Sequence, residues 1–163
     1  MHHCHDLESL SSPHIRPFTT SDQQRVMEIE KACSRFITQI SSILALYEVA
    51  SEGIIVAEAD RRVVGFLIGN LTVMRDGSKA GHVLSLAVDP AFRGLGIGRA
   101  LINYFSKACR CGGAKSLFLE VKKSNESARR FYSHLDFKEM YVLRRYYRMR
   151  GYTEDAVLMS TEL

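Results

Sequence analysis

Apolar residues recur along the chain with two different periods, and the changes of period divide it into predicted helices and strands. The short run from Ile15 to Phe18 is compatible with a strand. Thr20 and Gln23, three residues apart, resemble a capping box and predict that a helix begins there. Helical spacing then marks Val26, Ile29 and Cys33 in one predicted helix and Phe36, Ile37, Ile40, Ile43, Leu44 and Tyr47 in a second.

The middle of the chain changes to runs rich in β-branched residues. Two of them, Ile54–Ala57 and Val63–Val73, are joined at Asp60-Arg61-Arg62, and the turn signal Asp76-Gly77 follows the second. A third run, from His82 to Asp89, ends at Pro90. Short connections of this kind predict an antiparallel meander.

Helical spacing returns after Pro90 and is followed by another strand. The helix is marked by Gly98, Leu101, Ile102, Phe105 and Cys109 and ends at Gly112-Gly113. The next strand, Leu117–Val121, must run parallel to the strand before the helix. A short helix is then marked by Ala128, Phe131, Tyr132 and Leu135, and two last strands are predicted at Phe137–Leu143 and Asp155–Thr161. This order predicts a mixed α/β fold.

Length and composition are those of a single globular domain. The chain has 163 residues, 46% of them hydrophobic and 25% charged, with three prolines. We expect a flexible segment at residues 1–13 and one domain at 14–163. No apolar run approaches the roughly 20 residues of a membrane helix, and the first residues lack the pattern of a secretory signal. We therefore expect a cytoplasmic protein without membrane contact.

Charge and cysteine content add little on their own. The net charge of +4 is modest. The cysteines have neither disulfide nor zinc spacing, and we expect no functional metal at the histidine-rich start. Arginines concentrate in the last third, where they could attract the phosphates of a ligand, acidic peptides or RNA, or simply form a solvated surface: Arg129, Arg130, Arg144, Arg145, Arg148 and Arg150.

The segment from Arg93 to Gly98 combines glycines with arginine between a predicted strand and a predicted helix. A helix N-terminus offers free N–H groups and a positive dipole end, and glycines let phosphate oxygens approach the main chain. Arg93 and Arg99 add charge. A preceding meander argues against a dinucleotide-binding fold, and no P-loop lysine is present. The segment therefore predicts a phosphate site.

This segment is one of several short motifs that follow in a fixed order: Leu86 to Pro90, Arg93 to Gly98, Leu119-Glu120-Val121, Ser124-Asn125, Ala128, Phe131-Tyr132, Arg145-Tyr146-Tyr147 and Glu154-Asp155-Ala156. Together these motifs resemble the GNAT superfamily of N-acetyltransferases, and within it the RimI-type and NatA catalytic-subunit enzymes that act on protein N-termini. The resemblance implies a central mixed sheet of about six to seven strands with about four flanking helices. In this sheet an antiparallel meander precedes two parallel strands whose ends diverge around the cofactor.

The resemblance also implies that acetyl-CoA is the co-substrate and that no metal is required. Leu86, Ala87 and Val88 would pair through their backbone with the pantetheine arm. Asn125 would bond the pantetheine or acetyl end. The pyrophosphate would be held by Arg93, Gly94, Leu95, Gly96, Ile97, Gly98 and Arg99.

Three residues align with catalytic positions of the family. Glu120 would deprotonate the incoming amine, directly or through water, and Tyr132 would protonate the departing thiolate. His82 aligns with a second proposed base, and which of His82 and Glu120 is the main base stays open. Each could also be structural. Direct transfer in a ternary complex is expected, because the cysteines are badly placed for an acetyl-cysteine route.

Substrate choice is less well defined by the sequence. Tyr146 and Tyr147 align with paired tyrosines over the peptide entrance, and Phe36 and Ile37 could line a pocket for the first side chain or pack in the core. At Ser34 to Thr38 the sequence differs from the corresponding segment of NatA-type enzymes. Asp136 stands where glycine is common in the family. We expect acetylation of protein N-termini, ribosomal or nascent chains among them. The alternatives are acetylation of lysine or a small amine, a non-catalytic acyl-CoA-binding module, and a less favoured nucleic-acid-binding role.

Overall fold

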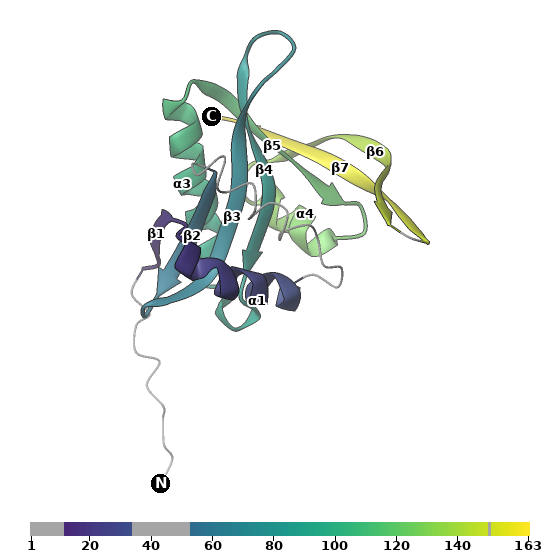
Figure 1. Ribbon diagram of the computed structural model, residues 1–163. Coiled ribbons are helices and arrows are strands. Elements are labelled where there is room, and N and C mark those ends of the chain that lie inside the picture. Colours follow the sequence, from purple (N-terminus) through teal and green to yellow (C-terminus); the bar gives the residue numbers. More distant parts are fainter. Residues whose placement is uncertain (1–11, 34–52, 150) are drawn as a thin grey trace. The chain divides into compact units, whose positions relative to one another are not determined.

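The strands of the molecule form one mixed sheet. In the computed structural model, which describes residues 12–33, 53–149 and 151–163, the strand order is β1-β2-β3-β4-β5-β7-β6 (Figure 1). The strands are β1 His14–Pro17, β2 Ile54–Ala59, β3 Arg62–Val73, β4 Lys79–Val88, β5 Ala114–Lys122, β6 Lys138–Met149 and β7 Tyr152–Glu162. The helices within these ranges are α1 Gln23–Cys33, α3 Ile97–Cys111 and α4 Glu126–Ser133, with 3-10 turns η1 Thr20–Asp22 and η2 Pro90–Phe92.

The chain divides into two compact units, and strands β3 and β4 run through both. The first unit comprises Met1–Phe66 and Ala87–Leu101, and the second comprises Leu67–Leu86 and Ile102–Leu163. In the first unit β1 pairs with β2 in antiparallel register, from His14 opposite Glu58 to Pro17 opposite Ile55. The most deeply buried side chains of this unit include Val26, Ile29, Val56, Val64 and Phe66.

The first helix begins one residue earlier than the predicted capping box. Thr19, not Thr20, is the N-cap of η1, and its partner is Asp22, not Gln23. The Asp22 carboxylate accepts the Thr19 N–H at 2.8 Å and the Thr19 hydroxyl at 3.0 Å. An acid fits this role better than glutamine, since it is shorter and charged near a helix N-terminus. The predicted Thr20–Gln23 box is therefore wrong.

Arg16 of β1 fixes the same carboxylate from the other side. Its guanidinium donates to both oxygens of Asp22, at 2.8 and 2.9 Å, and to Glu58 of β2 at 2.9 Å. Asp22 is buried. These hydrogen bonds from Arg16, and then those from Thr19, hold the pKa of Asp22 below its ordinary value. Arg16 thus ties the start of α1 to β1 and β2.

Two tight turns make the predicted meander. Asp60 and Arg61, the two residues between β2 and β3, both adopt left-handed backbone conformations, with φ of 49° and 61°. Two such residues form the turn type that matches the twist of a hairpin. The β3–β4 turn closes through Met74, whose N–H donates to the Ser78 carbonyl at 2.8 Å. Connections this short require antiparallel neighbours, as predicted.

In the second unit the strand after α3 runs parallel to β4, as the sequence predicts. Pairing of β4 with β5 extends from Lys79–Ala114 to Val83–Leu119 and stops there, although both strands continue. This is the predicted splayed pair. β7 pairs antiparallel with the other edge of β5, and β6 pairs antiparallel with β7; Figure 1 shows β6 in yellow-green beside β7 in yellow.

Close packing in this unit depends on a glycine of β4. A Cβ atom at Gly81 would lie 2.4 Å from Leu117 Cδ2 and 2.6 Å from Cys109 Sγ. Both partners are buried, and Cys109 belongs to α3. Any larger residue at position 81 would therefore push helix α3 or strand β5 away from β4.

The remaining element predictions agree with the structure in type but not in length. β4 begins at Lys79 rather than His82, and β6 and β7 extend toward each other beyond the predicted ends. Asp136 has a φ of 64°, so the aspartate adopts the left-handed conformation expected of the glycine that the resemblance implies there. The predicted second helix lies outside the described residues, as do residues 1–11. The domain boundary at residue 14 stays a prediction.

The Arg16–Asp22 contact generates a test of stability and its pH dependence. Asp22→Asn keeps the shape of the cap but removes its charge, and we expect the free energy of unfolding at neutral pH to fall by about 2 kcal/mol. Because the folded pKa is lowered, this contribution is present above the ordinary carboxyl pKa of about 4 and is lost as the pH falls through the folded value.

Urea denaturation over a range of pH measures both effects. The control is Glu28→Gln, an exposed acid on α1, which should change the free energy of unfolding by less than about 0.5 kcal/mol. A difference between Asp22→Asn and the parent protein that persists unchanged in acid would contradict the assignment.

Candidate active site

The glycine-rich segment leads directly into the N-terminus of α3, as predicted. The Gly96 carbonyl accepts the Ala100 N–H at 3.0 Å, so the first amides of the helix have no acceptor inside it. Gly94 and Gly96 have φ of 77° and 78°, and a Cβ atom built at either would have no heavy atom within 4 Å. The turn is therefore exposed main chain at the positive end of a 15-residue helix, which suits an anion.

The start of this turn is anchored from α1 and β3. The Asp89 carboxylate caps η2 by accepting the Ala91 N–H at 2.9 Å, and it also binds the guanidinium of Arg25. Arg25 Nε donates to the Val63 carbonyl at 3.0 Å. The pKa of Asp89 is lowered, first by the Ala91 amide and then by Arg25. Sequence analysis missed Arg25, because only the fold brings α1 to the end of β4.

Arg93 already uses part of its hydrogen-bonding capacity. Its guanidinium donates to the Val88 carbonyl and to the Cys33 sulfur, each at 3.3 Å. A guanidinium has five N–H donors, so others stay available for a phosphate oxygen. All these contacts lie in the first unit.

His82 and Glu120, predicted as alternative bases, form one pair in the second unit. His82 lies opposite Phe118 in the parallel register, and Glu120 follows two residues later on the same face of β5. The rings of His82 and Phe118 stack with centroids 4.3 Å apart, and His82 Nε2 lies 2.7 Å from Glu120 Oε2. The two polar side chains are only 18% and 14% exposed. A carboxylate only accepts, so the imidazole is the donor.

Two tyrosines of β6 lie beside this pair. The Tyr147 hydroxyl donates to the Glu120 carbonyl at 3.2 Å, and the Tyr146 ring stands edge-on to the Tyr147 ring. Burial raises the pKa of Tyr147 to about 12, with further contributions from Tyr146 and Glu120. Burial and then Glu120 also raise the pKa of Tyr146. The paired tyrosines are thus neutral neighbours of the catalytic candidate.

Tyr132 is a buried member of α4. It contacts Phe131 and Phe137 edge-on, with centroids 5.1 and 5.5 Å away. Burial, followed by the neighbouring Tyr147, raises its pKa well above the ordinary range of a phenol. Within the described part of the chain its hydroxyl makes no hydrogen bond. The hydroxyl therefore keeps its proton at neutral pH and has it available for transfer.

Asn125 has a structural contact besides its predicted role. Its side-chain oxygen accepts the Ala128 N–H at 3.1 Å and so caps α4. The side-chain NH2 group of Asn125 makes no contact in the described residues and could donate to a ligand. Leu86, Ala87 and Val88 form the end of β4, beyond its pairing with β5.

Three comparisons place this geometry among known proteins. Residues 23–137 match the model of the acetyltransferase (GNAT) family. The chain belongs to the GNAT acetyltransferase family. It is 38% identical over 149 residues to an uncharacterized N-acetyltransferase of Methanocaldococcus jannaschii, covering 89% of this chain and 88% of that protein. It is 41% identical over 116 residues to an N-alpha-acetyltransferase of Sulfurisphaera tokodaii, covering 66% and 68%.

A solved structure agrees with both relatives. The crystal structure of Ard1 from Thermoplasma volcanium superposes with a TM-score of 0.82 at 29% identity, covering 94% of this chain and 99% of that one. The resemblance drawn from the sequence is therefore confirmed, and with it the mixed fold and the enzyme class of an N-acetyltransferase. The individual site residues stay predictions.

Other features of the described residues offer no competing chemistry. Burial raises the pKa of Cys109 to about 11, so this thiol is a poor nucleophile. No group of three or more metal-ligating side chains occurs in the described ranges. None of the described helices is long and apolar enough to cross a membrane. Phe36 and Ile37, predicted at the substrate pocket, lie outside the described residues.

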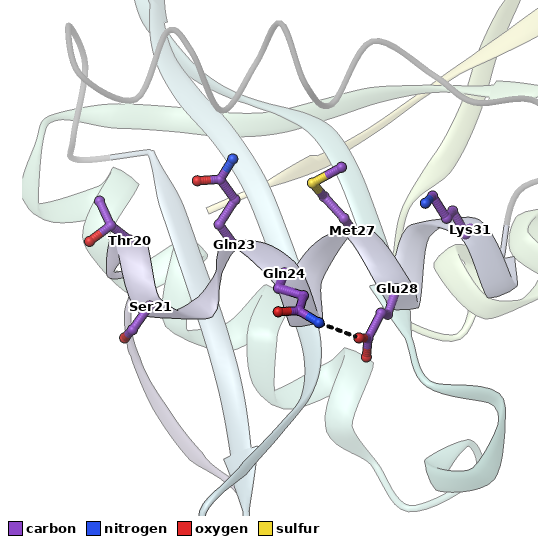
Figure 2. Close-up of a pocket in the computed structure, with 7 residues that line it drawn as sticks. All are labelled: Thr20, Ser21, Gln23, Gln24, Met27, Glu28 and Lys31. Atoms are coloured by element: carbon purple, nitrogen blue, oxygen red, sulfur yellow. Dashed lines mark hydrogen bonds between the residues drawn. The ribbon is translucent and has the colours of Figure 1, made fainter.

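A hollow of about 540 Å³ lies over η1 and α1 (Figure 2). Most of its lining residues are of polar types, and two of them form the Gln24–Glu28 hydrogen bond of 3.3 Å that the figure draws. None of the lining residues belongs to the turn at Arg93 to Gly98 or to the His82–Glu120 pair, and we assign it no part in catalysis. The residues are Thr20, Ser21, Gln23, Gln24, Met27, Glu28 and Lys31.

If the glycine-rich turn at Arg93 to Gly98 binds phosphate, adding one methyl group to it should weaken the binding of CoA. Gly96→Ala places alanine in a left-handed conformation at a cost of about 1 to 2 kcal/mol, which the turn can relieve only by moving its amides. We expect the Kd for CoA, measured by calorimetry, to rise about tenfold.

The matched control is Gly77→Ala in the β3–β4 turn. Gly77 has a φ of 81° and equally open surroundings, so the alanine there suffers the same strain. Both variants should lose similar stability, whereas only Gly96→Ala should weaken CoA binding. Equal Kd values for the two variants would remove the turn from the binding site.

Proposed function

We propose that the protein transfers the acetyl group of acetyl-CoA to the α-amino group of protein N-termini, by direct attack in a ternary complex. The observation that carries the proposal is the His82–Glu120 hydrogen bond of 2.7 Å beside the paired tyrosines of β6. The relative from Sulfurisphaera tokodaii, named an N-alpha-acetyltransferase, supports the acceptor class. Ribosomal and nascent chains are the substrates we propose, and the cytoplasm is the compartment.

The residues that are present fit acetyl-CoA. Exposed glycines at the N-terminus of α3, with Arg93 and Arg99 beside them, suit the charge and bulk of a pyrophosphate. The backbone groups at the end of β4 suit an extended pantetheine arm, which would pair with Leu86, Ala87 and Val88 as an added strand. When bound, the co-substrate supplies an acetyl thioester.

An ammonium group cannot attack the thioester, because its nitrogen has no free lone pair. The base therefore removes one proton from it. Glu120 accepts this proton and becomes neutral, while the hydrogen bond with His82 keeps the carboxyl group in position, and the proton then passes to solvent. The neutral amine then forms a bond to the thioester carbonyl carbon, with the Val88 amide as the candidate donor to the oxyanion. An α-amine has a pKa about 2.5 units below that of lysine, so the same base yields far more neutral α-amine.

Tyr132 completes the proton balance. As the carbon–sulfur bond breaks, the leaving thiolate takes the phenolic proton, and the second proton of the amine replaces it through solvent. A raised pKa keeps Tyr132 protonated until that step. Its edge-on contacts with Phe131 and Phe137 hold the ring in one orientation.

A peptide assay separates the proposed acceptor from the alternatives. Thiol release from acetyl-CoA is measured with three substrates: a peptide with a free α-amine and no lysine, the same peptide with a blocked α-amine and an internal lysine, and a small polyamine. Turnover confined to the first substrate is expected. Turnover confined to lysine or polyamine would reassign the acceptor, and no thiol release with any of them, despite CoA binding, would indicate a non-catalytic module.

The His82–Glu120 pair predicts non-additive mutant effects. Glu120→Gln should lower kcat about 100-fold without changing the Kd for acetyl-CoA. Because the two residues act as one unit, the double variant with His82→Gln should be no slower than the slower single variant. Glu139→Gln, a β6 acid paired with Arg129, is the control and should keep full activity. Additive losses would show that the two side chains act separately.

Tyr132→Phe removes only the hydroxyl. We expect kcat to fall about 100-fold while the midpoint of thermal unfolding stays within a few degrees of the parent value. Circular dichroism during heating and steady-state kinetics measure the two effects on the same preparation. An active variant with unchanged kcat would assign Tyr132 to packing alone.

A further inference from the structure

Strand β6 is interrupted beside the catalytic candidates by a bulge. Leu143 lies opposite Ala156 and Tyr147 opposite Glu154, so β6 has two more residues than β7 between these points. Arg145, within the bulge, has a left-handed backbone with a φ of 51°. Its N–H donates to Asp155 Oδ1 at 2.8 Å, and Arg148 Nε donates to its carbonyl at 3.0 Å. The bulge is thus held by specific contacts.

Three arginines in and beside the bulge carry positive charge. Arg144, Arg145 and Arg148 are exposed, and in the described part of the chain none of them forms an ion pair. The nearby acids bind groups other than these three guanidinium groups. Glu139 pairs with Arg129, Glu154 accepts from Ser124 and Tyr152, and Asp155 accepts the backbone N–H of Arg145.

The position of the bulge defines which part of a substrate it meets. Tyr147 donates to the backbone carbonyl of Glu120, and the Tyr146 ring is near enough to the Glu120 carboxylate for that charge to help raise the pKa of Tyr146, so Arg145 directly precedes a residue beside the proposed base. An extended peptide advances about 3.4 Å per residue, and an arginine side chain reaches about twice that distance. Residues two to four of a bound peptide therefore fall within reach of Arg144 and Arg145.

We propose that Arg144 and Arg145 select substrates that carry Asp or Glu within the few residues after the acetylated one. The inference rests on the proposed function for the position of the amine at Glu120. Arg148 supports the bulge through the Arg145 carbonyl. The charges act mainly on encounter and binding, so the selection is expressed in KM rather than in kcat.

Three peptides with the same first residue and length test this inference. Residues two to four are acidic in one, the corresponding amides in the second, and lysine in the third. The acidic peptide should exceed the amide peptide in kcat/KM by about 5-fold at low salt, and the lysine peptide should be the poorest. Because exposed charges are screened, the differences should shrink at about 0.5 M salt.

The test variant is Arg144→Gln with Arg145→Asn, since asparagine tolerates the left-handed conformation. It should turn over the acidic peptide at the rate of the amide peptide, with the amide rate unchanged. The matched control is Lys107→Gln with Arg110→Gln, which removes two exposed charges from α3 and should keep the preference. Thermal unfolding of both variants confirms that they are folded.

Peptide affinity, measured by fluorescence anisotropy in the presence of CoA, separates this inference from the proposed function. If no α-amine is acetylated, the proposed function fails. Tighter binding of the acidic peptide, lost in the test variant, would still support the proposed preference for acidic residues. Equal behaviour of all three peptides overturns it. So does a preference that survives in the test variant, or an effect of the substitutions confined to binding of an RNA duplex.

Discussion

The end of pairing between β4 and β5 is the constraint on which the site depends. Up to Val83–Leu119 the two strands satisfy each other's backbone groups, and beyond that point they continue separately. Backbone N–H and C=O groups that lie away from water need hydrogen-bonding partners. The diverging strand ends leave such groups available to a ligand, and this requires no particular side chain. This accounts for the small and unremarkable residues at Leu86 to Val88, whose identity matters less than their position.

The same register brings the proposed catalytic side chains together. Parallel pairing puts His82 opposite Phe118, and the period of two along β5 then puts Glu120 on the face where the imidazole lies. β7 covers the other edge of β5, and β6 follows it in the sheet, so that Tyr147 reaches the Glu120 carbonyl. The order of the strands in the sheet, rather than closeness in sequence, thus determines the contacts of the proposed base, its stacking partner and the tyrosine.

Much of this arrangement could be predicted from the sequence, and the failures have physical reasons. Periodicity predicts the strands, and the helix between two of them predicts the parallel pair, as the structure has it. The register between β4 and β5 could not be predicted, because sliding one strand by two residues leaves the same pattern of buried positions. For that reason His82 and Glu120 stood as rival bases, and Phe118 was not noticed.

Other failures came from local chemistry that several residues could satisfy. Thr19-x-x-Asp22 and Thr20-x-x-Gln23 both fit a helix start, and Arg16 on β1, six residues before Asp22, favours the acid. The bulge at Arg145 has no sequence signature, because the backbone strain there is offset by Asp155, ten residues later in the chain. A contact made only after β6 and β7 have paired cannot be inferred from either strand alone.

In the proposed function the two substrates would be recognised by different kinds of structure. Acetyl-CoA would meet main chain and a helix N-terminus, whose geometry depends on the fold around it. The acceptor peptide would meet side chains on a bulge whose two ends are fixed in register, at Leu143 opposite Ala156 and at Tyr147 opposite Glu154. Because both ends are held by strand pairing, we expect substitutions of exposed side chains within the bulge to leave Tyr147 on the Glu120 carbonyl. Preference for the acceptor could therefore change without disturbing the proposed base or the proposed site of acetyl-CoA.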